Sequence, residues 1–327
     1  MTIRKETIDM LASIPDVSVS QGMLLSRHTR FGIGGPAGAF VQASSEGAFA
    51  EALRVSRASG CALTVIGDGT NLIVSDRGFD GIVLRLTAKT IEREGATVRA
   101  GAGARLQALV DYSIDRGLGG LETMTGIPGS VGAAVYGNAG AYGHSIEERV
   151  RQVRFLDGAV VRSFGPAECN FQYRESVFKR HKEWIILSVE LAMTPAPAAE
   201  LRQTAEKIFG IRLEKYPASM KCAGSIFKNL ILAELPESLR RQIPERVIRE
   251  GKVPSAYFLE QVGAKGMRSG GIQVADYHAN LIYNAGAGTA GELCGLIVEL
   301  KSRVRKQFGL ELEEEVQYVG FVNCVIC

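Results

Sequence analysis

Two glycine-rich stretches contain the residue types that bind phosphate groups. The first, residues 65–76 (VIGDGTNLIVSD), follows an apolar run, so its successive main-chain N–H groups could form a nest around phosphate oxygens. The second, residues 126–135 (GIPGSVGAAV), leads into residues 138–143 (NAGAYG). Two such loops could hold the two halves of one dinucleotide, because clustered glycines let a ligand approach the backbone. The alternative is that these glycines form the tight turns of an ordinary sheet protein.

The sequence does not fit either of two common nucleotide-binding motifs, the Rossmann fingerprint and the P-loop. Residues 32–37 (GIGGPA) match G-x-G-x-x-G/A, but residues 26–30 (SRHTR) are not the apolar strand that should precede that motif. The residues that follow it are strand-like instead of helical. No G-x-x-x-x-G-K-[ST] occurs either. A Rossmann domain and a P-loop nucleotidase are therefore disfavoured.

The hydrophobic periodicity predicts a scaffold of mixed α and β type for these loops. Apolar runs of strand length alternate with two segments of helical spacing, residues 46–58 and 106–116. The predicted strands in this part are 39–43, 63–67, 82–86, 97–100, 150–156, 160–164 and 185–193. The phrase Thr194–Ala198 contains two prolines and interrupts the pattern, so we expect a domain boundary near it.

Beyond that phrase the pattern predicts helices over 199–209, 255–262 and 292–308 and strands over 271–274, 279–283 and 316–322. The last of these helices is strongly amphipathic. Residues 123–146 carry no charged side chain, yet their six glycines, proline and asparagine favour loops and turns over a membrane-spanning helix.

Composition indicates a globular protein of about two domains, with 46% hydrophobic and 22% charged residues in 327. The net charge of +3 and the lack of charge runs give no argument for nucleic acid or a membrane surface as partner. The start of the chain lacks the apolar core of a signal peptide, so a cytoplasmic protein is expected. The six cysteines are expected to be reduced thiols, and Cys324 and Cys327 lack the second pair that a zinc site needs, although a metal or redox role is the alternative.

Several phrases resemble the UDP-N-acetylenolpyruvoylglucosamine reductase family and occur in the family's order from about residue 29 to residue 320. They are residues 29–37 (TRFGIGGPA), 67–76 (GDGTNLIVSD), 120–132 (GLETMTGIPGSVG), 138–143 (NAGAYG), 173–176 (YRES), 223–229 (AGSIFKN), 263–266 (GAKG), 270–274 (GGIQV), 278–280 (HAN) and 312–316 (LEEEV). A single glycine motif is weak evidence, but this many phrases in order is strong.

The resemblance implies an α+β fold with an FAD-binding domain of the vanillyl-alcohol-oxidase or PCMH type at residues 1–205. A smaller α+β substrate-binding domain at 206–327 would follow, its C-terminal strand returning toward the active site. The resemblance also implies that NADPH reduces non-covalent FAD and leaves. Hydride then passes to UDP-N-acetylglucosamine enolpyruvate, which yields UDP-N-acetylmuramate for peptidoglycan synthesis. The short interval between Arg174 and Ser225 resembles the subgroup without an extra substrate-covering loop.

Matching the phrases places the proton donor at Ser225 and the two residues that interact with the substrate carboxylate at Arg174 and Glu315. A guanidinium suits the enolate-like charge that hydride addition pushes into that carboxylate, and a protonated acid could share the proton. Without the resemblance, Ser225 would be interpreted as a loop serine, Arg174 as a surface cation and Glu315 as one of several acids on a solvated edge.

The resemblance also implies the cofactor and substrate contacts. The FAD-binding residues would be Arg30, Gly67, Asp68, Gly69, Thr70, Asn71, Leu72, Ser75, Gly126, Ile127, Pro128, Gly129, Ser130, Gly132, Asn138, Ala139, Gly140 and Tyr142. The UDP group would contact Asn229, Lys265, Lys215 and His278, because cations and amides suit a diphosphate. A lone histidine is more often structural, so His278 is the weakest of these candidates.

This chain departs from the family pattern at a few positions. Glu314 and Leu230 stand where the family usually has proline, and residues 230–254 are longer and more charged than expected. Asp68 replaces a glycine, and its carboxylate argues against a phosphate at that loop unless the side chain points away.

Two other functions compete with this interpretation. One is an FAD-dependent oxidase of the same superfamily that acts on an alcohol or sugar. The other is a catalytically inactive nucleotide-sugar binding protein. Retention of Arg174, Ser225 and Glu315 together favours the reductase. The partners expected are NADPH and the UDP-sugar ether, with no nucleic acid, membrane or metal, and the chain is expected to be monomeric.

Overall fold

The computed structural model describes residues 3–321 and divides the chain into two compact units, each of mixed α and β structure. The first unit comprises the residues up to 23, 37–68 and 80–217, and the second comprises 24–36, 69–79 and the residues from 218 onward. Residues 205 and 206, where the domain limit was predicted, lie inside helix α7 (Ala198–Lys215). Cys324 and Cys327 lie outside the described residues.

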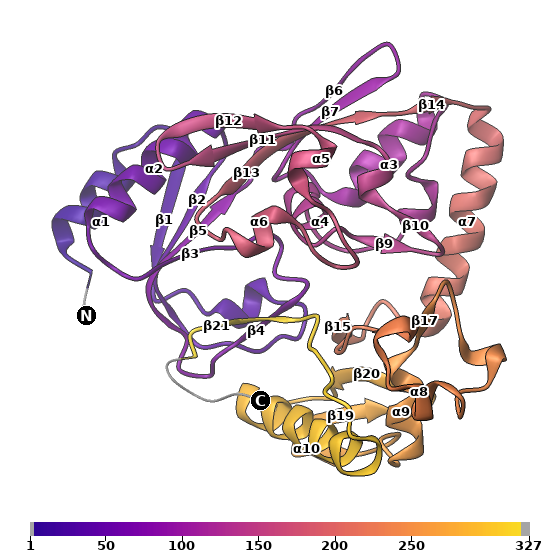
Figure 1. Cartoon of the computed structure of the whole chain (residues 1–327). Coiled ribbons are helices and arrows are strands. Elements are labelled where there is room, and N and C mark those ends of the chain that lie inside the picture. Colours follow the sequence, from indigo (N-terminus) through magenta and orange to yellow (C-terminus); the bar gives the residue numbers. More distant parts are fainter. Residues whose placement is uncertain (1–2, 322–327) are drawn as a thin grey trace. The chain divides into compact units, whose positions relative to one another are not determined.

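The first unit is built on two main sheets (Figure 1). One has the strand order β1-β2-β5-β3, and the other has the antiparallel order β12-β11-β13-β7-β6. Two-stranded sheets β9/β10 and β8/β14 complete it. Its strands are β1 (Val17–Gln21), β2 (Ala37–Ala43), β3 (Leu63–Val65), β5 (Phe79–Leu86), β6 (Ile91–Glu94), β7 (Thr97–Gly101), β8 (Leu118–Gly119), β9 (Gly140–Ala141), β10 (His144–Ser145), β11 (Val150–Asp157), β12 (Val160–Phe164), β13 (Ile185–Ala192) and β14 (Thr194–Pro195).

Helices cover these sheets and bury their apolar sides in one core. Besides α7 they are α1 (Lys5–Ala12), α2 (Glu46–Ala58), α3 (Leu106–Asp115), α4 (Val131–Tyr136), α5 (Pro166–Cys169) and α6 (Val177–Arg180). Helix α2 begins where it was predicted, because the Ser45 hydroxyl accepts a hydrogen bond from the Ala48 amide at 3.3 Å. Its residues Phe49, Ala52 and Leu53 are buried.

Helix α4 corrects the prediction of loops and turns throughout residues 123–146. The glycine content of that stretch suggested irregular structure, but Ser130 caps the helix by accepting from the Ala133 amide at 3.4 Å. Val131, Ala134 and Val135 are buried in the core, and this packing stabilises a helix that is too short to be stable alone.

The second unit joins three separate segments of the chain around one core. Phe31, Ile33 and Ile73 come from the two early segments and pack with residues beyond 225. Strand β4 (Leu72–Val74), within the stretch interpreted as a phosphate loop, pairs in parallel with β21 (Gln317–Val319), and Figure 1 shows the yellow β21 beside the purple β4.

A four-stranded antiparallel sheet of order β15-β20-β19-β18 forms the main part of this unit. Its strands and those of the small β16/β17 sheet are β15 (Lys221–Ser225), β16 (Leu230–Ile231), β17 (Lys252–Val253), β18 (Arg268–Ser269), β19 (Ile272–Ala275) and β20 (His278–Asn284). The helices are α8 (Glu237–Arg240), α9 (Ser255–Gln261) and α10 (Ala290–Phe308). Across residues 3–321, none of the helices combines the length and the apolar character that a membrane span requires.

Helix α10 has clear signals at both ends. Thr289 and Glu292 form a capping box, and Gly309 ends the helix with a left-handed φ of 66°. The Asp76 carboxylate, from a distant segment of the same unit, accepts hydrogen bonds from the amides of Ala290 at 2.8 Å and Gly291 at 3.0 Å. This carboxylate therefore satisfies two N-terminal amides and ties segment 69–79 to α10.

Replacing Asp76 with alanine is expected to lower the free energy of unfolding by about 1–2 kcal/mol, because two helix N-terminal amides lose a charged acceptor. Chemical denaturation followed by circular dichroism measures the change. Asp9→Ala is the matched control, since Asp9 is an exposed carboxylate within α1. Equal effects of the two substitutions would contradict a specific role for Asp76.

Candidate functional site

Two of the predicted cofactor loops lie against each other in the first unit. A Cβ added at Gly67, after β3, would lie 2.7 Å from Ser130 Oγ, and a Cβ at Gly132 would lie 2.7 Å from Ala102 Cβ. Only glycine fits at such distances, so the loops present backbone where other residues would present side chains. Gly126 and Gly129 add positive φ angles to the second loop. Loops of this kind fit the diphosphate of FAD, which backbone amides bind.

Asp68 does not leave an isolated negative charge at this loop. Its carboxylate forms an ion pair with the guanidinium of Arg85 on β5, and the side chains are only 18% and 21% exposed. The pair has no net charge, so the electrostatic argument against a phosphate at this loop is largely removed.

The motif of residues 138–143 and the motif of residues 173–176 come together in the first unit. The Asn138 side chain donates to the main-chain oxygen of Gln172 at 2.9 Å, and the Ser176 hydroxyl donates to that of Tyr136 at 2.7 Å. Asn138 is buried with a φ of 43°, so its amide supports the turn that carries Arg174. Burial, with a smaller contribution from the nearby Glu175 charge, raises the pKa of Tyr136 to about 12, so this phenol stays protonated at neutral pH.

Arg174 lies in a tight turn closed by hydrogen bonds in both directions between the main chains of Gln172 and Glu175, each 3.0 Å long. Its guanidinium donates to the main-chain oxygen of Gly140 at 2.9 Å and lies 5.3 Å from the centre of the Tyr173 ring. A guanidinium can bind a carboxylate through two parallel hydrogen bonds, which is the role predicted for Arg174.

The remaining predicted cofactor residues, Arg30 and residues 69–75, belong to the second unit. The Arg30 amide donates to the Gly69 carbonyl at 3.1 Å, and a Cβ on Gly69 would lie 1.8 Å from the His28 oxygen. Ser75 is engaged in local structure, because its hydroxyl accepts from the Arg77 amide at 3.2 Å. These contacts fold the stretch into a strand and its flanking turns.

Ser225 ends strand β15 at an irregularity in its pairing with β20. Gly224, with a φ of 82°, provides the bend, since few other residues adopt that conformation. Phe227, two residues after Ser225, is held by Asn280 of β20. The Asn280 side chain accepts from the Phe227 amide at 2.9 Å and donates to the Phe227 carbonyl at 2.8 Å. Asn280 is 2% exposed and thereby fixes the chain that leaves Ser225.

Replacing Asn280 with alanine is expected to cost about 2–4 kcal/mol of unfolding free energy, because two buried main-chain groups of Phe227 would lose their partner. Chemical denaturation measures the loss. Gln261→Ala, at an exposed position of the same unit, is the control and should change stability by less than about 0.5 kcal/mol. A comparably small effect of Asn280→Ala would show that the two hydrogen bonds of Asn280 to the Phe227 main chain contribute little to stability.

The segment that carries Glu315 runs antiparallel beside the chain that leaves Ser225. The Glu315 amide donates to the Ile226 carbonyl at 2.7 Å, and the Lys228 amide donates to the Glu313 carbonyl at 2.9 Å. On its other side, the Asn71 side chain donates to the Glu315 carbonyl at 2.9 Å. The structure thus brings together the predicted proton donor and the predicted acid, and it assigns the Asn71 amide to holding Glu315.

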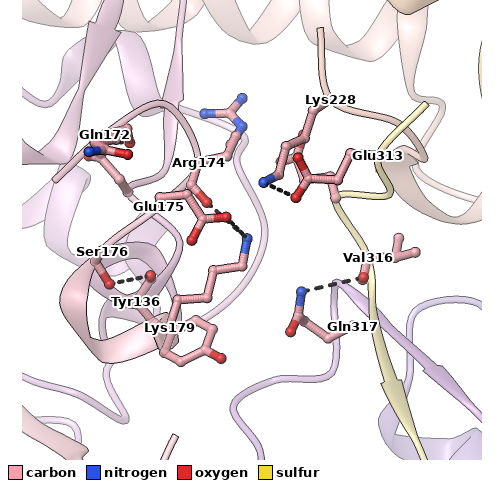
Figure 2. Close-up of polar contacts among 12 residues, drawn as sticks. Tyr136, Gln172, Arg174, Glu175, Ser176, Lys179, Lys228, Glu313, Val316 and Gln317 are labelled. Atoms are coloured by element: carbon pink, nitrogen blue, oxygen red, sulfur yellow. Dashed lines mark hydrogen bonds and ion pairs between the residues drawn. The ribbon is translucent and has the colours of Figure 1, made fainter. Parts of the chain in front are cut away.

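Two lysines balance the acids that flank Glu315. Lys228 is buried and its Nζ lies 2.5 Å from Glu313 Oε1. Figure 2 marks this ion pair with a dashed line. Lys301 of α10 lies 2.9 Å from Glu314, and both side chains are less than 15% exposed. The two acids that precede Glu315 are therefore both paired with lysines.

The residues predicted to bind the UDP group lie in different places. Asn229 follows the Ser225 strand, and His278 is the first residue of β20 in the same unit. Lys265 is exposed and pairs with Glu260 at 3.0 Å. Lys215 is the last residue of α7, in the first unit, and its Nζ lies 5.1 Å from the Tyr216 ring centre.

Two supporting residues had been given no role from the sequence, Asn280 and Lys179. Asn280 is an amide side chain within an apolar strand. Because a buried amide needs hydrogen-bond partners, this position in the sequence could have indicated a structural role. Lys179 lies five residues after Arg174 in the chain, and its Nζ donates to the main-chain oxygen of Arg174 at 3.0 Å, a contact that no sequence pattern shows.

Two family models match this chain. Residues 37–161 match the family described as FAD binding domain, and residues 214–319 match the family described as UDP-N-acetylenolpyruvoylglucosamine reductase, C-terminal domain. The UDP-N-acetylenolpyruvoylglucosamine reductase of Solibacter usitatus is 63% identical over 95% of this chain and 99% of its own. The protein of the same name from Rubrobacter xylanophilus is 37% identical over 90% and 93%.

A solved structure gives the same result for the fold. The crystal structure of UDP-N-acetylenolpyruvylglucosamine reductase from Thermus caldophilus has a TM-score of 0.72, with 28% identity, and the match covers 93% of this chain and 99% of that one. The fold and the cofactor loops define an FAD-dependent oxidoreductase of the PCMH type. The chain belongs to the UDP-N-acetylenolpyruvoylglucosamine reductase family.

Proposed function

We infer that this protein reduces UDP-N-acetylglucosamine enolpyruvate to UDP-N-acetylmuramate with electrons from NADPH, through bound FAD, in peptidoglycan precursor synthesis. The observation that carries this conclusion is the 63% identity to a relative of that name over nearly the whole of both chains. Bound FAD would supply the hydride chemistry that links NADPH to the terminal carbon of the enolpyruvyl group.

Three residues are proposed to act on the enolpyruvyl group. Ser225 donates a proton to the carbon next to the carboxylate, while Arg174 and Glu315 interact with the carboxylate itself. Hydride addition increases the negative charge on that carboxylate, so groups that bind it more tightly in the transition state lower the barrier. The pairing of the Ser225 and Glu315 segments through Ile226 supports a common role for these two.

We propose that FAD is held by the glycine loops around Gly67, Gly126–Gly132 and Asn138–Tyr142, with Arg30 and residues 69–75 contributing. The UDP group is assigned to Asn229, Lys265, Lys215 and His278. Cationic and amide side chains support this assignment, because a diphosphate needs hydrogen-bond donors. Lys265 would exchange its exposed pair with Glu260 for the diphosphate.

The visible flavin band of the purified protein tests the function directly. NADPH is added under anaerobic conditions and should bleach the band, and UDP-N-acetylglucosamine enolpyruvate should then restore it. A band that bleaches but returns only with another acceptor would favour an oxidase-like flavoprotein. A protein that cannot be reconstituted with FAD would contradict the cofactor assignment.

The setting is proposed to be the cytoplasm, and the chain is proposed to act as a monomer. Among the described residues, Cys61, Cys169 and Cys222 carry free thiols, which supports a reducing compartment. Light scattering of the FAD-loaded protein measures the oligomeric state, and a dimer mass at micromolar concentration would contradict the monomer.

A further inference from the structure

The backbone of Arg174 has an unusual conformation. Its φ of 59° lies in the left-handed region, where a side chain with a Cβ is disfavoured by roughly 1–2 kcal/mol. Such conformations persist when the surroundings hold them, and they concentrate at functional positions. Something near Arg174 must therefore stabilise this turn.

Lys179 provides that stabilisation in the structure. Helix α6 brings its side chain back to the turn, where Nζ donates to the main-chain oxygen of Arg174 at 3.0 Å and to Glu175 Oε1 at 2.7 Å. Figure 2 shows the Lys179 ammonium between these two oxygens. The Lys179 side chain is only 13% exposed, so its charge depends on these partners for compensation.

The contact with the carbonyl has a direct effect on the Arg174 side chain. The direction of that oxygen is set by ψ of Arg174, so an ammonium bound to it restrains ψ and thereby narrows the backbone conformations open to this residue. The guanidinium is held at its other end by the Gly140 carbonyl at 2.9 Å. Backbone and side chain are thus fixed together before any substrate is bound.

We propose that Lys179 is a positioning residue for Arg174: its ammonium, balanced by Glu175, locks the Arg174 backbone so that the guanidinium is presented to the substrate carboxylate. This inference rests on the proposed role of Arg174. Lys179 itself touches neither substrate nor cofactor in this scheme. It acts through the arginine by limiting the conformations that the arginine can adopt.

The test compares the two half-reactions of the FAD-loaded enzyme in a stopped-flow instrument. Lys179→Met keeps the length of the side chain and removes the ammonium. Flavin reduction by NADPH should stay within about twofold of the parent rate, while reoxidation by UDP-N-acetylglucosamine enolpyruvate slows by about 10- to 100-fold, the usual cost of a small misplacement. In an Arg174→Ala background, Lys179→Met should slow reoxidation by less than about twofold further.

Two controls separate positioning from general stability. Arg154→Met removes another half-buried cation of the first unit, paired with Glu46 at 3.2 Å, and should leave reoxidation unchanged. FAD content and the thermal midpoint are measured for every variant. If Lys179→Met gives too little folded protein, Lys179→Gln is used instead. Its amide keeps a hydrogen-bond donor, so its reoxidation should be slowed less than that of Lys179→Met.

Three results would overturn the inference. If the Lys179 variants reoxidise at the parent rate while Arg174→Ala reoxidises slowly, the role of Lys179 is overturned and that of Arg174 stands. Equal loss of both half-reactions would show that Lys179 only supports the fold. Full reoxidation in Arg174→Ala would overturn the assigned role of the arginine together with the inference that depends on it.

Discussion

Ser225→Ala is expected to leave flavin reduction by NADPH intact and to slow reoxidation by the enolpyruvyl substrate by about 10²- to 10⁴-fold, the range for loss of a general acid. The hydroxyl is proposed to supply the proton that completes reduction, and alanine supplies none. The main chain around this position is held by the bend at Gly224 and by the two hydrogen bonds between Asn280 and Phe227. The substitution should therefore preserve the fold. Anaerobic stopped-flow absorbance separates the two half-reactions.

Ser269→Ala is the matched control for this variant, because Ser269 is a half-buried strand serine of the same sheet. It should reoxidise at the parent rate. Equal loss of both half-reactions in Ser225→Ala would indicate that the serine supports structure. Full activity in Ser225→Ala would assign the proton to another donor.

Glu315→Gln is expected to have a comparable effect on the same half-reaction, a slowing of about 10²- to 10⁴-fold. Glutamine preserves the shape of the side chain but cannot share or supply a proton. The main-chain hydrogen bonds of residue 315 to Ile226 and Asn71 do not depend on its carboxyl group, so the segment should stay in place. The rate of return of the flavin band gives the measurement.

The neighbouring acids provide the control for Glu315. Glu311 is exposed and paired with Arg305, and Glu311→Gln should leave both half-reactions at the parent rate. If Glu311→Gln and Glu315→Gln behave alike, position 315 has no special role among these acids. Full activity of Glu315→Gln would remove it from the proposed mechanism.

The parts of the fold that could be predicted are those whose signals are local. The predicted apolar face of α10 is buried at Leu293, Leu296 and Leu300, and the capping box at its start is legible in the sequence. Strand β12 has the predicted bounds. In such segments the spacing of apolar residues and the end signals lie within one element, so no knowledge of distant partners is needed.

The parts that could not be predicted depend on distant partners. Residues 72–74 were interpreted as part of a glycine loop, but they form a strand because Gln317–Val319 pairs with them. Helix α4 escaped prediction because glycines dominate its surroundings, although its buried side chains and its cap decide the structure. The pairing of residues 72–74 with Gln317–Val319 has no local signal in the sequence.

The candidate site has the same limits. The motifs that contain Arg174, Ser225 and Glu315 could be identified as phrases, and the structure adds the contacts that hold them. Asn71 was predicted to bind the cofactor, and the structure adds a contact that the sequence did not indicate, because the side-chain amide of Asn71 donates to the Glu315 carbonyl. Lys179 and Asn280 show their roles only through partners that folding brings near, so composition and spacing could not assign them.

The three-segment composition of the second unit has a consequence for synthesis in the cell. Phe31, Ile33 and Ile73 emerge early from the ribosome, but their core partners, such as Leu296, Leu312 and Val316, are made last. At 5–20 residues per second, these side chains wait roughly 10–50 s for the residues that bury them. The nascent chain is therefore expected to expose these apolar side chains throughout most of translation.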